Sequence, residues 1–331
     1  MERFALAAAV VLGFALTAAL CSLFVPLRRV LERREQQQQP VQPEQPRPAP
    51  LRAPLWGGLC AAAGTVAAVG VGWLAACVGQ PELLGSEGRL MTRLLTALAG
   101  SLAFGVVGLA EDLARMRSPA ALGLRRDVRL LLEALAAAFV LLLLRAAGCL
   151  PRGLGVPGAG YVLLGSAVPF LWAVLMVALA ECARIAERDE GAVCGAAFVA
   201  MLALMMVEAG LGVSGLAVLP GALAGALVAL GLWAFPPARL GVGCCGSLLA
   251  AGAIGCIPLS LDMTSLTVPL ALPFWAAGGL LTAQLLCAKR TGKPLRCWVK
   301  KHKMSPETVF LCSFALSAVG YILALALLRW C

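Results

Sequence analysis

Residues that could do chemistry are concentrated in short charged segments between long apolar runs. One segment carries the adjacent acids Glu111 and Asp112, and another carries Arg184, Glu187 and either Glu190 or Asp189 at the spacing of one helix face. Carboxylate oxygens are the ligands that Mg²⁺ prefers in proteins. Asp112, Glu187 and Glu190 could therefore hold a divalent ion together, if the fold brings the two segments to one place.

A third segment, residues 241–247, has the small residues of a catalytic loop but no acid. It reads Gly-Val-Gly-Cys-Cys-Gly-Ser, and Cys244 and Cys245 stand where a metal-binding carboxylate would be expected. A thiol is a poor ligand for Mg²⁺. The two cysteines could join Cys297 and His302 in a thiolate metal site. They could equally be small apolar residues, because the chain has 13 cysteines and no CxxC spacing.

The composition indicates an integral membrane protein. Of the 331 residues, 61% are hydrophobic and 13% are charged, and the mean hydropathy is +0.90. In soluble domains about 25% of the residues are charged and about 45–50% are apolar. A chain this apolar is expected to bury its helices in a lipid bilayer rather than to fold in water.

The long apolar runs predict an all-α, polytopic membrane protein of about ten transmembrane helices. Runs of about 18 or more apolar residues can cross a hydrocarbon core of ~30 Å as helices. We interpret residues 1–331 as one transmembrane domain, with residues 28–54 as a Pro- and Gln-rich loop that is extended and solvated. The predicted spans are 4–27, 56–78, 91–110, 128–150, 161–181, 192–213, 216–235, 245–261, 267–288 and 308–329.

The positions of Lys and Arg predict the orientation of these spans. The loops after spans 1, 3, 5, 7 and 9 hold six, five, two, one and seven of the 27 Lys and Arg residues, when Arg129 at the start of the fourth span is counted with the second of these loops. Cationic loops stay in the cytoplasm. Both termini are therefore expected to be extracytoplasmic, and all the charged segments described above are expected to share the cytoplasmic face.

The formal net charge of +10 is mainly a consequence of this topology. Nucleic acid is not an expected partner, because no basic surface interleaved with aromatic residues is present. An anionic lipid is a more suitable partner for Arg125, Arg126 and Arg129, which lie near the predicted membrane surface. Arg129 and Glu133 are also spaced for an i,i+4 ion pair at the start of the fourth span.

The sequence resembles the polyprenyl-phosphate sugar-1-phosphate transferases, and among them most closely the phospho-N-acetylmuramoyl-pentapeptide transferases. The resemblance covers essentially the whole chain, with its matching segments in the family's order. These segments are 53–58 (Ala-Pro-Leu-Trp-Gly-Gly), 108–112 (Gly-Leu-Ala-Glu-Asp), Arg129 with Glu133, 181–195, 235–247, and 294–298 followed by 305–309.

The resemblance implies a ten-helix enzyme of the bacterial plasma membrane with its active site facing the cytoplasm. Such an enzyme transfers a sugar-1-phosphate from a UDP-sugar to undecaprenyl phosphate with Mg²⁺, in the synthesis of cell-wall precursors. A homodimer is a further expectation. The implied catalytic residues are Glu111, Asp112, Glu187 and Glu190. The implied substrate-binding residues are Arg129, Arg184, Arg239, Gly243, Gly246 and Ser247, and the implied metal positions are Asp112 and Cys244.

Most departures from the family pattern fall on reactive positions. Cys244 replaces the Mg²⁺-binding Asp, and Arg184 replaces an Asn. Ala234 replaces a substrate-contacting Asn, Gly241 replaces an aromatic residue near the uracil, and Arg296, Cys297 and Trp298 replace three histidines. Because phosphoryl transfer depends on charge neutralisation, loss of a metal ligand predicts impaired activity, and binding of a UDP-sugar is doubtful. Arg184 could supply positive charge to a diphosphate in partial compensation.

Three hypotheses for the function follow. The first is a working transferase with an altered site, and the second is a catalytically dead relative that binds polyprenyl phosphate or a cell-wall partner. The third is a transporter or another polytopic protein with accidental similarity, which is weak because the spans lack the Gly- and Pro-broken, charged midplane pairs of transporters. The fold cannot decide between the first two, because the activity resides in the site.

Overall fold

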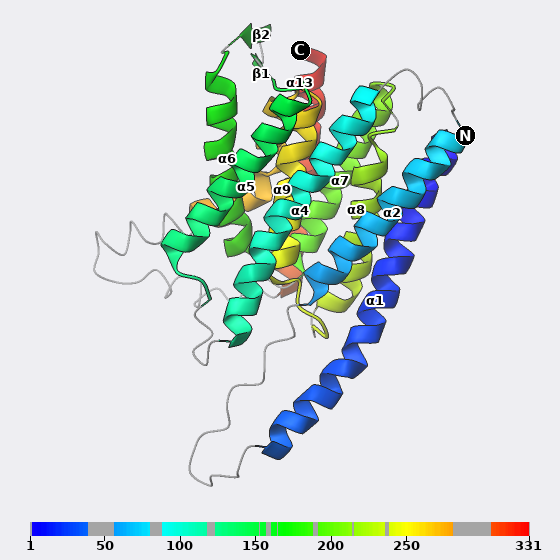
Figure 1. Cartoon of the computed structure of the whole chain (residues 1–331), viewed down its shortest axis with the longest axis vertical. Helices are drawn as coiled ribbons and strands as arrows, with labels where there is room; N and C mark the ends of the chain where they lie inside the picture. The colour runs from blue at the N-terminus through cyan, green and yellow to red at the C-terminus, as the bar shows by residue number, and fades with distance from the viewer. Residues whose placement is uncertain are drawn as a thin grey trace.

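A bundle of long helices makes up almost all of the structure (Figure 1). The computed structural model describes residues 2–38, 56–79, 88–117, 123–151, 153–156, 160–163, 165–187, 191–213, 215–235, 238–280 and 306–330. Its principal helices are α1 (Glu2–Gln38), α2 (Gly57–Gly79), α4 (Gly88–Arg117), α5 (Arg126–Ala146), α6 (Ala167–Ala186), α7 (Ala192–Gly210), α8 (Val218–Ala234), α9 (Gly243–Ser260), the short α10 (Thr267–Leu270) and α13 (Pro306–Trp330).

The helices confirm an all-α, multi-pass membrane protein. Seven of the described helices are long and apolar enough to cross a bilayer. Helix α8 is equally apolar but has 17 residues, and α5 carries Arg129, Glu133 and Arg145 within its 21 residues. The predicted total of ten spans stays a prediction.

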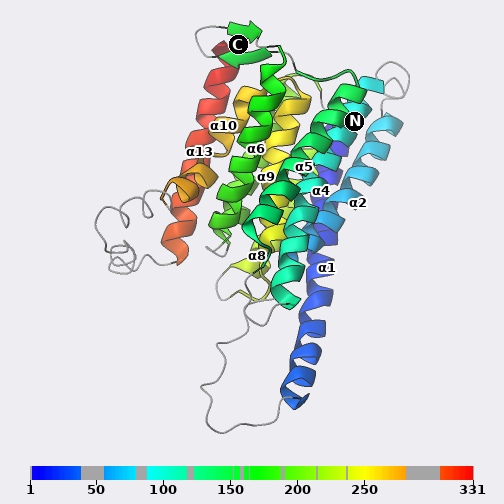
Figure 2. The same ribbon diagram turned by 60° about the vertical axis from the view of Figure 1, so that its left-hand side comes forward.

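Both ends of the chain lie at the same end of the bundle, as Figure 1 shows. The C-terminal end of α4, the N-terminal end of α5 and the start of α9 lie at the opposite end, toward which α1 also extends beyond the other helices. Figure 2 shows α13 at the periphery beside α10, against which it packs. These three helix ends therefore lie at the end of the bundle that faces away from both termini.

The fifth predicted span was placed several residues too early. Residues 153–156 (β1) and 160–163 (β2) form a two-stranded antiparallel hairpin, and α6 begins only at Ala167. Gly165 just before the helix has φ +59°, a left-handed conformation that a continuous right-handed helix cannot contain. Hydropathy alone predicts that the apolar residues of β2 belong to the helix, because it does not distinguish a strand from a helix.

The ninth predicted span, 267–288, is interrupted. Helix α10 ends at Leu270, and residues 272–280 form a second helical segment after a turn at Ala271. Pro273 has no N–H to continue the hydrogen bonds of α10, but it is acceptable in the first turn of the following segment. Residues 281–288 lie outside the described part of the chain.

Helix α9 forms the centre of the bundle. All its residues are buried, and it packs against α4, α6, α2 and α7. Small residues allow this close approach, because a Cβ added to Gly108 of α4 would overlap the backbone of Cys244. On the opposite side of α9, Trp172 of α6 donates an N–H···O bond to the carbonyl of Gly255, 3.3 Å away. Helix α9 is thus packed against α4 near its start and against α6 near its C-terminal end.

Candidate functional site

The charged residues predicted to form a site do come together, where α4, α5 and α6 meet the first turn of α9. Glu111 and Asp112 lie near the end of α4, and Glu187 follows the last residue of α6. Glu111 and Asp112 are 2% and 1% exposed, so both carboxylates are withdrawn from solvent. Buried carboxylates need hydrogen-bond donors or cations around them, and the structure supplies both.

Asp112 accepts the free backbone N–H groups at the start of α9. Its Oδ1 accepts from the N–H of Cys244 at 3.0 Å, and its Oδ2 accepts from the N–H of Cys245 at 2.9 Å. The first N–H groups of a helix have no partner within that helix, and the helix dipole favours an anion at this position. Asp112 therefore caps α9 from a different helix and has both oxygens engaged.

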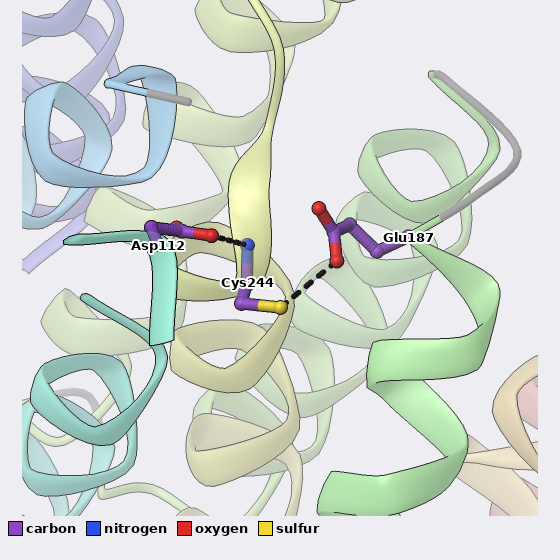
Figure 3. Close-up of side chains that lie close together, drawn as sticks. All are labelled: Asp112, Glu187 and Cys244. Atoms are coloured by element: carbon purple, nitrogen blue, oxygen red, sulfur yellow. Dashed lines mark hydrogen bonds between the residues drawn. The ribbon is translucent and has the colours of Figure 1, made fainter. Parts of the chain in front are cut away.

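Cys244 lies between the two acids, as Figure 3 shows. Its thiol donates a hydrogen bond to Oε2 of Glu187 at 2.9 Å. The ligand atoms of Asp112, Glu187 and Cys244 all lie within 4.8 Å of one another. The structure thus brings together three of the residues that the sequence singled out, from α4, α9 and the end of α6.

Arg115, one turn after the acid pair on α4, enters the same cluster. Its Nη1 lies 3.3 and 3.2 Å from the two carboxylate oxygens of Glu187, and its Nη2 donates to Oε1 of Glu111 at 2.8 Å. Nη1 is also 3.9 Å from Oδ1 of Asp112. One guanidinium therefore faces three carboxylates.

A second ion cluster adjoins the first and joins α5 to α6. Arg129 donates to Glu181 through Nε at 2.7 Å and through Nη2 at 3.3 Å, and its Nη1 lies 3.7 Å from Glu111. Arg184 also donates to Glu181, at 2.7 Å. Arg129 and Arg184 thus share the single negative charge of Glu181, and the availability of Arg184 to a diphosphate stays a prediction.

The predicted i,i+4 pair between Arg129 and Glu133 is wrong. Neither carboxylate oxygen of the fully buried Glu133 has a hydrogen-bond partner among the described residues, and Arg129 turns to Glu181. Spacing on one helix makes such a pair possible, but a neighbouring helix can offer a better acceptor. Arg129 is also 8% exposed, whereas Arg125 and Arg126 are exposed. Only the last two can meet a lipid headgroup directly.

The glycines and the serine of segment 241–247 have structural roles. Gly243 has φ +69° and begins α9, and a Cβ on Gly246 would crowd the backbone of Gly58. Ser247 donates from its Oγ to the carbonyl of Cys244 at 3.2 Å. The N–H of Gly57 donates to the carbonyl of Gly241 at 3.2 Å. Gly57 and Gly58, which belong to the family-like segment 53–58, thus contact Gly241 and Gly246 of the family-like segment 235–247.

The remaining predicted residues are peripheral or lie outside the described part of the chain. Arg239 is exposed on the connection from α8 to α9, and its backbone N–H donates to the carbonyl of Trp233 at 2.9 Å. Glu190 is among the residues that the structure does not describe, as are Arg296, Cys297, Trp298 and His302. The alternative thiolate site with Cys297 and His302 therefore stays a prediction.

The sequence does not predict two of the residues in these ion clusters as site residues: Arg115 of the first cluster and Glu181 of the second. Arg115 is three and four residues after Asp112 and Glu111, a spacing that places all three on one face of α4. This spacing could have shown its contact with the acids of its own helix. No local pattern shows its contact with Glu187, 72 residues away, or the contact of Arg129 with Glu181.

The cluster does not suit Mg²⁺. Both oxygens of Asp112 accept backbone N–H groups, both oxygens of Glu187 face Arg115, and the third ligand is a thiol. A divalent ion ~4 Å from a guanidinium would be repelled by roughly 8 kcal/mol at an effective dielectric constant of about 20. The residues present therefore do not fit a metal at this position.

The helix bundle defines a multi-pass membrane protein, and the buried charged residues of this site lie together at one end of the bundle. Residues 94–262, half of the chain, match the family described as glycosyl transferase family 4. The protein belongs to this family, and its resemblance to the polyprenyl-phosphate sugar-1-phosphate transferases is confirmed. The matched region runs from α4 to the end of α9 and contains every residue of the two ion clusters.

A similar protein is the phospho-N-acetylmuramoyl-pentapeptide-transferase of Desulforudis audaxviator. The two are 32% identical over 170 residues, which is 48% of this chain and 50% of the relative. The match thus spans about half the length of that relative.

Proposed function

We propose that this protein is a phospho-N-acetylmuramoyl-pentapeptide-transferase-like member of the family, in which transfer of the sugar-1-phosphate is strongly impaired. It binds undecaprenyl phosphate in the bacterial plasma membrane, with the site facing the cytoplasm. Family membership and the similarity to the Desulforudis audaxviator protein support the class of reaction. The positive-inside distribution of Lys and Arg supports the orientation.

The observation that carries the impairment is the engagement of the acidic residues by the chain itself. Asp112 is occupied by the N-terminus of α9, and Glu187 is occupied by Arg115 and by the thiol of Cys244. Phosphoryl transfer is catalysed mainly by positioning and by neutralising the developing charge. Carboxylates neutralised within the protein cannot hold the metal that would do this, and they are poorly placed to accept a proton from an attacking phosphate.

The catalytically dead relative remains as a second candidate function, favoured by the same network. The two ion clusters tie the ends of α4, α5 and α6 to the start of α9. Such a network is suited to holding the helix ends in place while the apolar faces and the exposed Arg125 and Arg126 receive a polyprenyl phosphate. The two candidates differ only in whether any transfer takes place.

Turnover and lipid binding test the two parts of the proposal separately. Purified protein is incubated with UDP-MurNAc-pentapeptide, undecaprenyl phosphate and Mg²⁺, and release of UMP is followed. We expect release at least ~10³-fold slower than for an active relative, because loss of charge stabilisation costs several kcal/mol. Native mass spectrometry of the same preparation should show retained polyprenyl phosphate. Rapid Mg²⁺-dependent release would refute the impairment, and absence of lipid where an active relative retains it would refute the binding.

A further inference from the structure

We infer that Arg115 replaces a divalent cation in this protein: its guanidinium is a covalently attached positive charge that holds the acidic site together without metal. The inference concerns the charge balance of one cluster, so it does not depend on whether the protein binds lipid or turns over a nucleotide sugar. It rests on the position of Arg115, on the chemistry of Cys244 and on the occupied oxygens of Asp112.

The guanidinium has the position expected of a bridging cation. It contacts acids on two elements, with Glu111 2.8 Å from Nη2 and both oxygens of Glu187 within 3.3 Å of Nη1. Asp112 is 3.9 Å from Nη1. An ordinary helix-surface pair would need only the i,i+4 contact with Glu111. The contact with Glu187 instead connects the end of α4 to the end of α6.

The charges around this site nearly balance without a metal when the adjoining ion cluster is included. Cys244 keeps its thiol proton, which it donates to Glu187. The N-terminus of α9, which both oxygens of Asp112 contact, contributes about half a positive charge. Four carboxylates then face three guanidinium groups: those of Glu111, Asp112, Glu181 and Glu187, and those of Arg115, Arg129 and Arg184. Arg115 is the guanidinium that faces the three potential metal ligands, so little net negative charge is left to attract a divalent ion.

Burial makes the replacement stable. The side chain of Arg115 is 20% exposed, and those of Glu111 and Asp112 are 3% and 1% exposed. Charges withdrawn from water are screened weakly and persist only when they are paired. Arginine suits this position because its planar, delocalised group can donate to several carboxylates at once and always stays charged.

Mn²⁺, used as a spin probe for a hard divalent ion, tests the inference in detergent-solubilised protein without lipid or nucleotide. Electron paramagnetic resonance of free Mn²⁺ should show no stoichiometric site in the wild type. Arg115→Met should create a site that binds Mn²⁺ at least about tenfold more tightly, because removal of a nearby positive charge is worth more than 1.4 kcal/mol. A second substitution, Asp112→Asn, should abolish the new site.

Two controls separate the loss of the charge at this position from a general change of charge. Arg117→Met removes an exposed arginine from the same turn of α4 and should leave Mn²⁺ binding as in the wild type. Arg115→Lys keeps the positive charge and should do the same. If Arg115→Met does not give monodisperse protein, Arg115→Met combined with Glu111→Gln removes one acid with the cation and keeps Asp112, Glu187 and Cys244.

Two results would overturn the inference. One is stoichiometric Mn²⁺ binding by the wild type that is lost in Asp112→Asn, which would show that a metal coexists with Arg115. The other is a folded Arg115→Met protein, single or combined with Glu111→Gln, that binds no more Mn²⁺ than the wild type. Neither result depends on the UMP-release and lipid experiments, so the inference and the proposed function fail separately.

Discussion

Replacement of Arg129 by Met should lower the free energy of unfolding by about 3 kcal/mol. Arg129 makes a close cross-helix ion pair, with Nε 2.7 Å from Oε1 of Glu181 and Nη2 3.3 Å from Oε2. Methionine keeps much of the apolar stem but has no charge. Glu181 would lose its bidentate partner, and Glu111 would lose the guanidinium nitrogen 3.7 Å away.

The magnitude follows from the burial of the two partners. Removing one member of a buried ion pair costs about 3–5 kcal/mol, because the other charge is left without compensation. The side chain of Arg129 is 9% exposed and that of Glu181 is 24% exposed. Water and Arg184, which donates to Glu181 at 2.7 Å, can replace part of the lost interaction. The cost should therefore lie at the lower end of this range.

A matched control lies one turn earlier on the same helix. Arg125 and Asp127 are 3.7 Å apart, and both side chains are 84% exposed. Solvent-exposed pairs contribute about 0–1 kcal/mol. Unfolding of Arg129→Met and Arg125→Met in mixed dodecylmaltoside and SDS micelles, followed by circular dichroism, should therefore show a large loss for the first and little for the second.

A double-mutant cycle shows whether the effect belongs to the pair. Glu181→Gln keeps an amide oxygen that can still accept from Arg184, while it removes the negative charge that Arg129 contacts. The double variant should be more stable than the sum of the two single losses predicts, by about 1–3 kcal/mol. The reasoning would be refuted if Arg129→Met were no more harmful than Arg125→Met, or if the two losses were simply additive.

Two further predictions concern the packing and the cap of α9, measured by the same unfolding assay. Gly58→Ala should cost at least ~2 kcal/mol, because its Cβ would overlap the backbone of Gly246, whereas Gly70→Ala on the same helix meets no atom within 4 Å and should be tolerated. Equal effects of the two glycine substitutions would contradict this packing. Asp112→Asn should cost about 1–3 kcal/mol, because its NH₂ group would face one of the two backbone N–H donors of α9 and leave that donor unpaired. Asp127→Asn, at a side chain that is 84% exposed, is the matched control, and an equal loss there would refute the cap.

Hydropathy was sufficient for the class of fold because a bilayer imposes a simple requirement. Each crossing segment must satisfy its own backbone hydrogen bonds, so a long apolar run is necessarily a helix. The errors occurred where that requirement was not decisive. The apolar strand β2, next to Gly165, was assigned to α6, and the interruption before Pro273 was not expected.

The candidate site could be predicted in part. The resemblance predicts that Asp112, Glu187 and Cys244 belong to one site, and the structure places their ligand atoms within 4.8 Å of one another. The same sequence reasoning paired Arg129 with Glu133, whereas Arg129 contacts Glu181 of α6. Spacing along one helix cannot identify a partner on another helix.

The sequence by itself determined that this chain crosses a membrane many times, that its charged segments gather on one face, and to which family it belongs. These properties depend on composition, on charge distribution and on the order of motifs. Each of these can be read along the chain without knowing which residues contact one another. Only the tertiary structure decided which cation neutralises which acid. Ion pairing depends on distance and burial, and Arg115 meets Glu187 only because α4 and α6 end at the same place beside the first turn of α9.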